Sequence, residues 1–184
     1  MDAWGWTVQL LNGWAGASSL FLVAAGLSLI FGVTRIVNFA HGSLFMLGVY
    51  GATSLAGLLM PVLGDAGYWL GLVGAALAVG LLGAVIEMAL LRRIYRAPEL
   101  FQLLATFALV LVIKDAVLWI WGPEELLGPR APGLEGSVTI LDRKFPAYDL
   151  FLIVVGPLML AAVWLLLTRT RIGLVIQAAL THPE

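Results

Sequence analysis

The polar side chains between the first two long apolar runs are the residues best suited to handle a solute. The stretch "TRIVNFAHGSLFMLG", residues 34–48, contains four of them: Arg35, Asn38, His41 and Ser43. The first three recur at every third position, so a helical continuation would place them along one face. At membrane depth, such groups and irregular backbone are tolerated where they line a water-filled cavity or bond across helices. We therefore expect an opened helix start that lines a solute pathway. This pathway segment comprises Asn38, Phe39, His41, Gly42 and Ser43.

A second interpretation of the same stretch remains open. Asn38 is a good helix N-cap, and a turn outside the membrane needs no pathway to explain its polarity. In the first interpretation, backbone amides at the start of the helix could also attract a substrate carboxylate.

Motifs for catalysis are missing from the sequence. The two histidines, His41 and His182, belong to no H-E-x-x-H motif, and no G-x-S-x-G elbow occurs. Neither lysine, Lys114 or Lys144, completes the G-K-[ST] of a phosphate loop. With no cysteine in the chain, we expect no enzyme activity, metal site or cofactor. Any energy source must therefore be a partner protein.

The elements that position these residues follow from composition. Of 184 residues, 61% are hydrophobic and 11% are charged, and the mean hydropathy is +1.01. Soluble domains carry about 25% charged residues, so this is the composition of a membrane protein. The net charge of -1 also argues against nucleic acid as a partner.

Five segments are long and apolar enough to cross the membrane as helices, which takes about 20 residues each. The sequence predicts an all-α, polytopic transmembrane helix bundle with spans at residues 12–33, 39–62, 68–91, 100–121 and 150–167.

Orientation follows from the basic residues, which gather on the cytoplasmic side of membrane proteins. Three clusters of them fall on one side of the five spans: Arg35; Arg92, Arg93 and Arg96; and Arg169 and Arg171. Most acidic residues and most tryptophans fall on the other side. We therefore expect the N-terminus outside and the C-terminus inside.

The outer loop, residues 122–149, is the one sizeable segment predicted outside the membrane. Proline and glycine interrupt it repeatedly. Within it, "SVTILDRKF" has the β-branched content of a short hairpin around Asp142 and Arg143.

Charged and small residues within the spans have plainer explanations than a site. Lys114 and Asp115 interrupt the fourth span, but Lys114 is about 10 Å of helix rise from Trp121 and can extend toward the outer interface. Glu87 can reach the inner interface or pair with a nearby arginine. Four glycines of the third span would allow close helix packing: Gly71, Gly74, Gly80 and Gly83.

Two stretches resemble a known family. "GLSLIFGVTRIVNFAHGSLFMLGVYGA" is similar to the N-terminal signature of the permease subunits of branched-chain amino acid ABC importers, with "NFAHG" as its core. "IEMALLRRIYRAPELFQLLATFALVLVIKDAVLWIWG" resembles the family's third span, basic turn and fourth span, although "YRAPEL" departs from its usual Arg-Pro-Leu-Arg run. Urea and amide permeases are close relatives, so a urea or short-chain amide permease is the alternative within this class.

The resemblance implies a bacterial cytoplasmic membrane protein that works by alternating access. It implies four partners: a paralogous permease subunit, two ABC ATP-binding subunits and a soluble substrate-binding protein. "TRTRIGLVIQAALTHPE" resembles the start of the cytoplasmic segment that docks on the ATPase, with Gln177 where arginine is common. The ATPase-coupling residues it implies, within residues 169–184, are Arg169, Arg171, Gly173, Gln177, Ala178 and Glu184.

The family resemblance also implies further spans after Glu184. We expect either a fragment of a longer permease or a truncated membrane protein that inserts without transporting. Without the resemblance, "RTR" after an apolar span is an ordinary stop-transfer signal.

Overall fold

The computed structural model describes residues 3–34, 38–140, 143–171 and 173–174. The chain divides into two compact units, each described separately below. The first contains residues 1–35 and 133–184, and the second contains residues 36–132.

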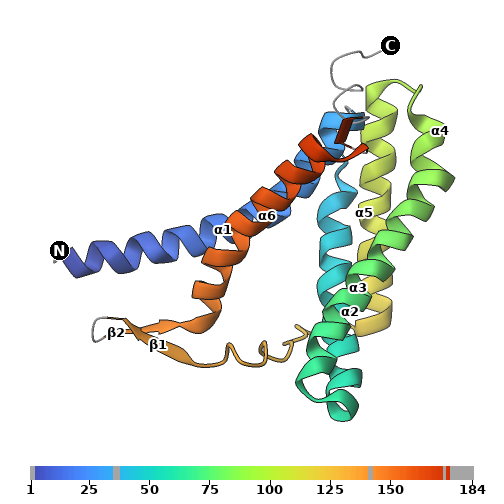
Figure 1. Ribbon diagram of the computed structural model, residues 1–184. Helices are drawn as coiled ribbons and strands as arrows, with labels where there is room; N and C mark the ends of the chain where they lie inside the picture. The colour runs from blue at the N-terminus through green and yellow to red at the C-terminus, as the bar shows by residue number, and fades with distance from the viewer. Residues whose placement is uncertain (1–2, 35–37, 141–142, 172, 175–184) are drawn as a thin grey trace. The chain divides into compact units, whose positions relative to one another are not determined.

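Five long helices account for most of the described residues (Figure 1): α1 (Ala3–Thr34), α2 (Ala40–Leu63), α3 (Asp65–Ile86), α5 (Glu99–Trp121) and α6 (Ala147–Arg169). A π-helical turn, η1 (Glu87–Leu91), and a short helix, α4 (Arg92–Ile94), continue α3. Within the described residues, five helices are long and apolar enough to cross a membrane. This confirms the predicted class of fold.

The helix bounds differ from the predicted spans mainly at the ends of the first and third spans. The first helix begins at Ala3 instead of near residue 12, and the third span runs from Asp65 through η1 to Ile94. Hydropathy marks the part of a helix that suits hydrocarbon, whereas the helix itself continues as long as its backbone hydrogen bonds do.

In the first unit, α1 packs against α6, and a hairpin precedes α6. At the helix contact, a Cβ placed on Gly156 would overlap the side chain of Ser18, which is buried. The predicted hairpin is confirmed: β1 (Ser137–Ile140) pairs antiparallel with β2 (Arg143–Pro146). The Ala147 N–H donates to the Gly136 carbonyl at 3.0 Å, which joins the hairpin to the start of α6.

In the second unit, α2 and α3 form a tight antiparallel pair. Gly64 has φ +59° between them, a conformation that glycine adopts without strain. A Cβ on Gly71 would lie 2.7 Å from the backbone nitrogen of Ala56, so only glycine permits this approach. Gly74 also meets α2, whereas Gly80 and Gly83 have no such neighbour within 4 Å. The prediction of close packing therefore holds for two of the four glycines.

Helix α5 packs against α2 through one face. Its buried residues recur at helical spacing: Gln102, Thr106, Ile113 and Val117. Near its end, the Trp121 indole N–H donates to the Ser54 hydroxyl at 2.7 Å, and the Trp121 ring lies 5.4 Å from that of Tyr50. Helices α2 and α5 are thus joined by both apolar packing and hydrogen bonding.

Candidate functional site: the start of α2 and the end of α6

Asn38 organises the start of α2. Its side-chain oxygen accepts the Ala40 N–H at 3.0 Å, and its backbone carbonyl accepts the His41 N–H at 3.2 Å. Both bonds satisfy amides that the first turn of a helix leaves without helical partners. Asn38 and Ala40 are buried, while the intervening Phe39 is 51% exposed. The side-chain bond that the N-cap interpretation of Asn38 requires is therefore present. Phe39, rather than Asn38, is the residue directly before α2.

Fewer residues of the pathway segment lie outside the helix than the sequence predicted. His41, Gly42 and Ser43 lie inside α2, and only Asn38 and Phe39 are non-helical. The reason is that Asn38 supplies acceptors for the first amides, so a regular helix can begin at Ala40. Arg35 lies outside the described residues.

Gly42 has open space beside it. It is exposed, and an added Cβ would meet no atom within 4 Å. His41 and Ser43, on either side, are half-buried. Gly42 therefore does not serve helix packing within this unit, in contrast to Gly71.

Two polar residues on α5 were missed by the sequence analysis. Thr106 is 0% exposed and its hydroxyl donates to the Leu103 carbonyl at 3.1 Å. Gln102 is also buried, and its amide donates to the Ala97 carbonyl at 2.9 Å and the Tyr95 carbonyl at 3.2 Å. Their signal in the sequence was a four-residue spacing of polar side chains in an apolar span, which places both on one face.

Lys114 and Asp115 do not join this buried face. Both are exposed, whereas their neighbours Ile113 and Val117 are buried. In the second unit, the two charged residues therefore face away from the packed side of α5.

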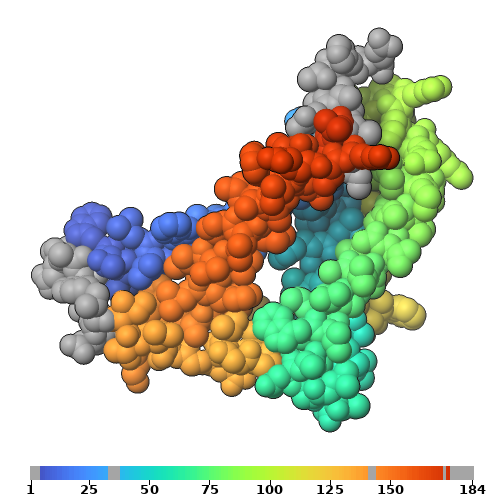
Figure 2. Space-filling model, in the orientation of Figure 1, coloured from blue at the N-terminus to red at the C-terminus, as the bar shows by residue number. Residues whose placement is uncertain are grey.

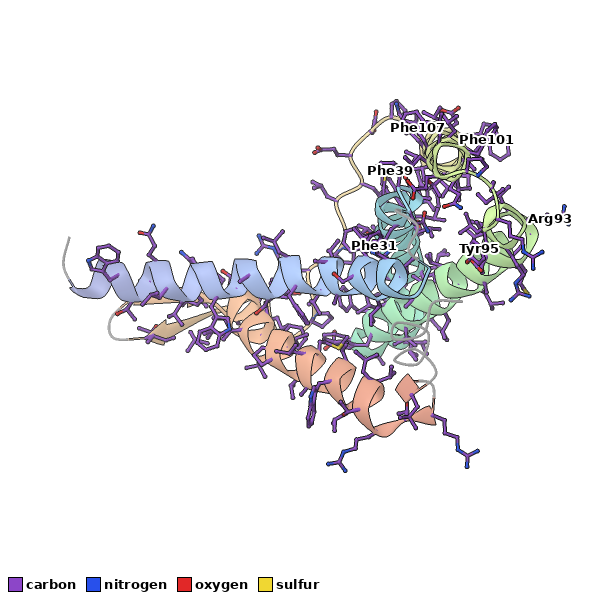
Figure 3. The ribbon with its side chains drawn as sticks, turned by 90° about the horizontal axis from the view of Figure 1, so that it is seen from above. Phe31, Phe39, Arg93, Tyr95, Phe101 and Phe107 are labelled. Atoms are coloured by element: carbon purple, nitrogen blue, oxygen red, sulfur yellow. The ribbon has the colours of Figure 1, made fainter. Side chains whose placement is uncertain are left out.

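Figure 3 shows α5 nearly end-on, with Phe101 and Phe107 labelled on it and Phe39 at the start of α2.

A sharp corner ends α6 in the first unit. Thr170 has an extended backbone, with φ −111° and ψ 156°, and a helical turn follows it. The Thr170 hydroxyl donates to the Leu166 carbonyl at 2.6 Å and accepts the Gly173 N–H at 3.1 Å. Thr170 is thus the N-cap of the next turn while its hydroxyl remains bonded to α6.

Gly173 fits this corner because it has no side chain. It is buried, and a Cβ there would overlap the carbonyl oxygens of Leu166 and Leu167. Arg169 and Arg171, on either side of Thr170, are exposed. Of the predicted coupling residues, the corner brings these two arginines and Gly173 together. Gln177, Ala178 and Glu184 lie outside the described residues.

The comparisons with known proteins bear on both sites. The sequence profile described as "Branched-chain amino acid transport system / permease component" matches residues 9–183. The chain belongs to this permease family. The match includes α2, the corner after α6 and all but the first six residues of α1. Together with the five apolar helices, membership identifies an integral membrane protein.

Among individual relatives, the chain is similar to permease proteins of high-affinity branched-chain amino acid transport systems. It is 27% identical to LivH of Escherichia coli (strain K12) over 124 residues, which are 66% of this chain and 40% of the relative. LivH of Salmonella typhimurium is 26% identical over the same shares. BraD of Pseudomonas aeruginosa is 26% identical over 172 residues, 90% of this chain and 56% of the relative. The chain thus spans about half the length of these relatives. No solved structure matches it.

Proposed function

We propose that this permease is the membrane subunit of an ABC importer for branched-chain or related amino acids in the bacterial cytoplasmic membrane. The observation that carries the proposal is the family match over residues 9–183, made by a chain with five apolar helices. Each relative named above is a permease protein of a branched-chain amino acid transport system. Transport proceeds by alternating access, and partner subunits hydrolyse the ATP.

The substrate pathway runs past the start of α2. Support comes from the exposed, unfilled position at Gly42 and the polar groups of His41 and Ser43 beside it. Gly42 offers backbone to a solute without an intervening side chain. Asn38 holds this helix start in place through its bonds to Ala40 and His41, so it acts as a positioning residue.

The corner at Thr170 transmits motion from the ATPase. A coupling segment is effective only if it moves with the helix to which it is attached. The Thr170 hydroxyl bonds both the last turn of α6 and the first turn after it, and Gly173 packs against α6 carbonyls. The exposed Arg169 and Arg171 then face the ATPase.

The partners that this function requires are a paralogous permease subunit, two ATP-binding subunits and a soluble binding protein outside. Crosslinking tests the proposal. Because the chain contains no cysteine, single cysteines at Arg171 and Gln177 can carry a photocrosslinker in the assembled transporter. We expect both to capture the ATP-binding subunit, whereas a matched cysteine at Lys144, on the hairpin, does not. Capture of only lipid or other permease helices from positions 171 and 177 contradicts the coupling assignment.

A further inference from the structure

The inner end of α3 is held by an unusual side-chain contact. The Tyr95 hydroxyl donates to the Glu87 carboxylate, eight residues earlier. In an α-helix, residues eight positions apart are about 80° apart around the axis and about 12 Å apart along it, so this bond requires both side chains to extend toward each other. The π-helical turn η1, with its i→i+5 bonds, changes this phase. Partial burial, then the bond to Glu87, raises the pKa of Tyr95, which keeps the phenol a proton donor.

The same tyrosine is fixed from the other side of the turn. Its backbone carbonyl accepts the Gln102 amide, which also donates to the Ala97 carbonyl. The Ala97 N–H in turn donates to the Ile94 carbonyl at 2.9 Å. Glu87, Tyr95 and Gln102 therefore tie η1, α4 and the start of α5 into one ordered turn, which we name the arginine turn, residues 92–98.

This turn presents three cations to its surroundings. Arg92, Arg93 and Arg96 are all exposed. Figure 3 shows Arg93 and Tyr95 on opposite sides of the segment, and side chains of this light-green region project from the surface in Figure 2. Of the nearby acids, Glu87 is engaged by Tyr95, whereas Glu99 is exposed in the first turn of α5. The turn thus carries a net positive charge.

Apolar side chains flank the arginines on both helices. Met88 and Leu90 of η1, and Leu100 and Phe101 of α5, are exposed. Both helices are parts of segments apolar enough to span the membrane. A cationic turn directly beside exposed apolar surface complements a molecule that has an anionic head and hydrocarbon chains.

We propose that the arginine turn binds the phosphate headgroup of an anionic phospholipid, whose acyl chains lie against the apolar residues beside it. Guanidinium groups bind phosphate through paired, charge-assisted hydrogen bonds. Free phosphate carries the same anionic group as the lipid headgroup, but it would leave the flanking apolar side chains uncovered. An anionic phospholipid therefore complements both the arginines and the apolar side chains. The inference is independent of the proposed transport function, because it rests only on this turn and its neighbours.

Lipid titration of the purified full-length protein in neutral detergent tests the inference. Bound dioleoyl phosphatidylglycerol and dioleoyl phosphatidylcholine would be counted separately by native mass spectrometry. The test variant is Arg92→Gln/Arg93→Gln. The matched control is Arg130→Gln/Lys144→Gln, which removes two exposed charges from the loop segments after α5. A basic residue near a membrane surface contributes about five-fold in anionic-lipid affinity, so the test variant should lose about 25-fold.

The control should bind the anionic lipid as the parent does, and the parent should prefer it to phosphatidylcholine. Tyr95→Phe keeps all three arginines but releases Glu87, so it should show a smaller loss. Equal affinity in the test variant and the parent overturns the proposal, as does equal binding of the two lipids. Displacement by inorganic phosphate at the lipid's concentration would show a free-anion site instead. An unchanged affinity in Tyr95→Phe contradicts the role of the hydrogen bond in ordering the turn.

Discussion

Gly173 donates its backbone N–H to the hydroxyl oxygen of Thr170 at 3.1 Å, while that hydroxyl donates to the Leu166 carbonyl at 2.6 Å. One side chain therefore ends α6 and starts the next helical turn. Gly173 reinforces the corner because its backbone lies against the Leu166 and Leu167 carbonyls, where a Cβ would overlap them. The angle between α6 and the following turn is set by local bonds within the chain.

The first prediction concerns this corner. Thr170→Ala removes an N-cap, which typically stabilises a helix by about 0.5–2 kcal/mol. Opening of the turn should become several-fold more frequent, so amide hydrogen exchange in residues 171–174 should accelerate. Thr168→Ala is a matched control, because its hydroxyl also donates to a carbonyl four residues earlier, at 2.7 Å, but caps no following turn. Equal exchange in the two variants would contradict the capping role.

The second prediction separates two kinds of glycine. Gly42→Ala has room for its methyl group and should stabilise α2 by about 0.5–1 kcal/mol through helix propensity. Gly71→Ala forces a Cβ against α2 backbone and should destabilise by about 1–3 kcal/mol. Thermal unfolding in detergent measures both. If Gly42 lines the pathway, its alanine variant should also transport more slowly per folded molecule, despite its greater stability.

The third prediction concerns the side chains of the pathway segment. His41→Ala and Asn38→Ala should lower uptake per folded molecule without preventing membrane insertion. His41→Gln, which retains hydrogen bonding, should keep most of the activity. Asn38→Ala should in addition lose about 0.5–2 kcal/mol of stability, because the Ala40 N–H loses its acceptor. Gly80→Ala, at an open position in α3, serves as the control. Wild-type rates in both alanine variants would remove these residues from the pathway.

Topology is the fourth prediction. The clusters of basic residues predict that the arginine turn lies in the cytoplasm and the hairpin outside. A cysteine at Gly136 should therefore react with a membrane-impermeant reagent in intact cells, and one at Arg93 should not. The reverse pattern would invert the orientation.

The helices and the hairpin could be predicted from sequence because their signals are local. Long apolar runs specify membrane helices, and the β-branched residues of Ser137–Ile140, followed by a polar turn, indicated the hairpin of β1 and β2. The extent of opening at Asn38 could not be predicted, because it depends on whether a side-chain oxygen reaches the Ala40 N–H. A sequence pattern lists the donors and acceptors, but it does not decide between a capped helix and an opened one.

The residues that form the corner at Thr170 could be predicted only in part from the sequence. Arg171 and Gly173 were found through the family pattern, which carries no physical role for either residue. Thr170 was missed, although a threonine just before an apolar segment is a recognisable N-cap signal. Likewise, the contact between Glu87 and Tyr95 spans eight residues and includes the π-helical turn η1, so a search for the usual i, i+3 and i, i+4 pairs does not find it.

Uptake of radiolabelled leucine into proteoliposomes tests the proposed transport function most directly, with the full-length permease reconstituted together with the proposed paralogous subunit, ATP-binding subunits and binding protein. We expect ATP-dependent uptake that excess isoleucine or valine suppresses and that urea or acetamide leaves unchanged. Suppression by urea or acetamide, but not by isoleucine or valine, would instead assign the chain to urea or amide transport. ATP-dependent uptake that persists at the same rate when this permease is omitted would contradict its role as the transport subunit.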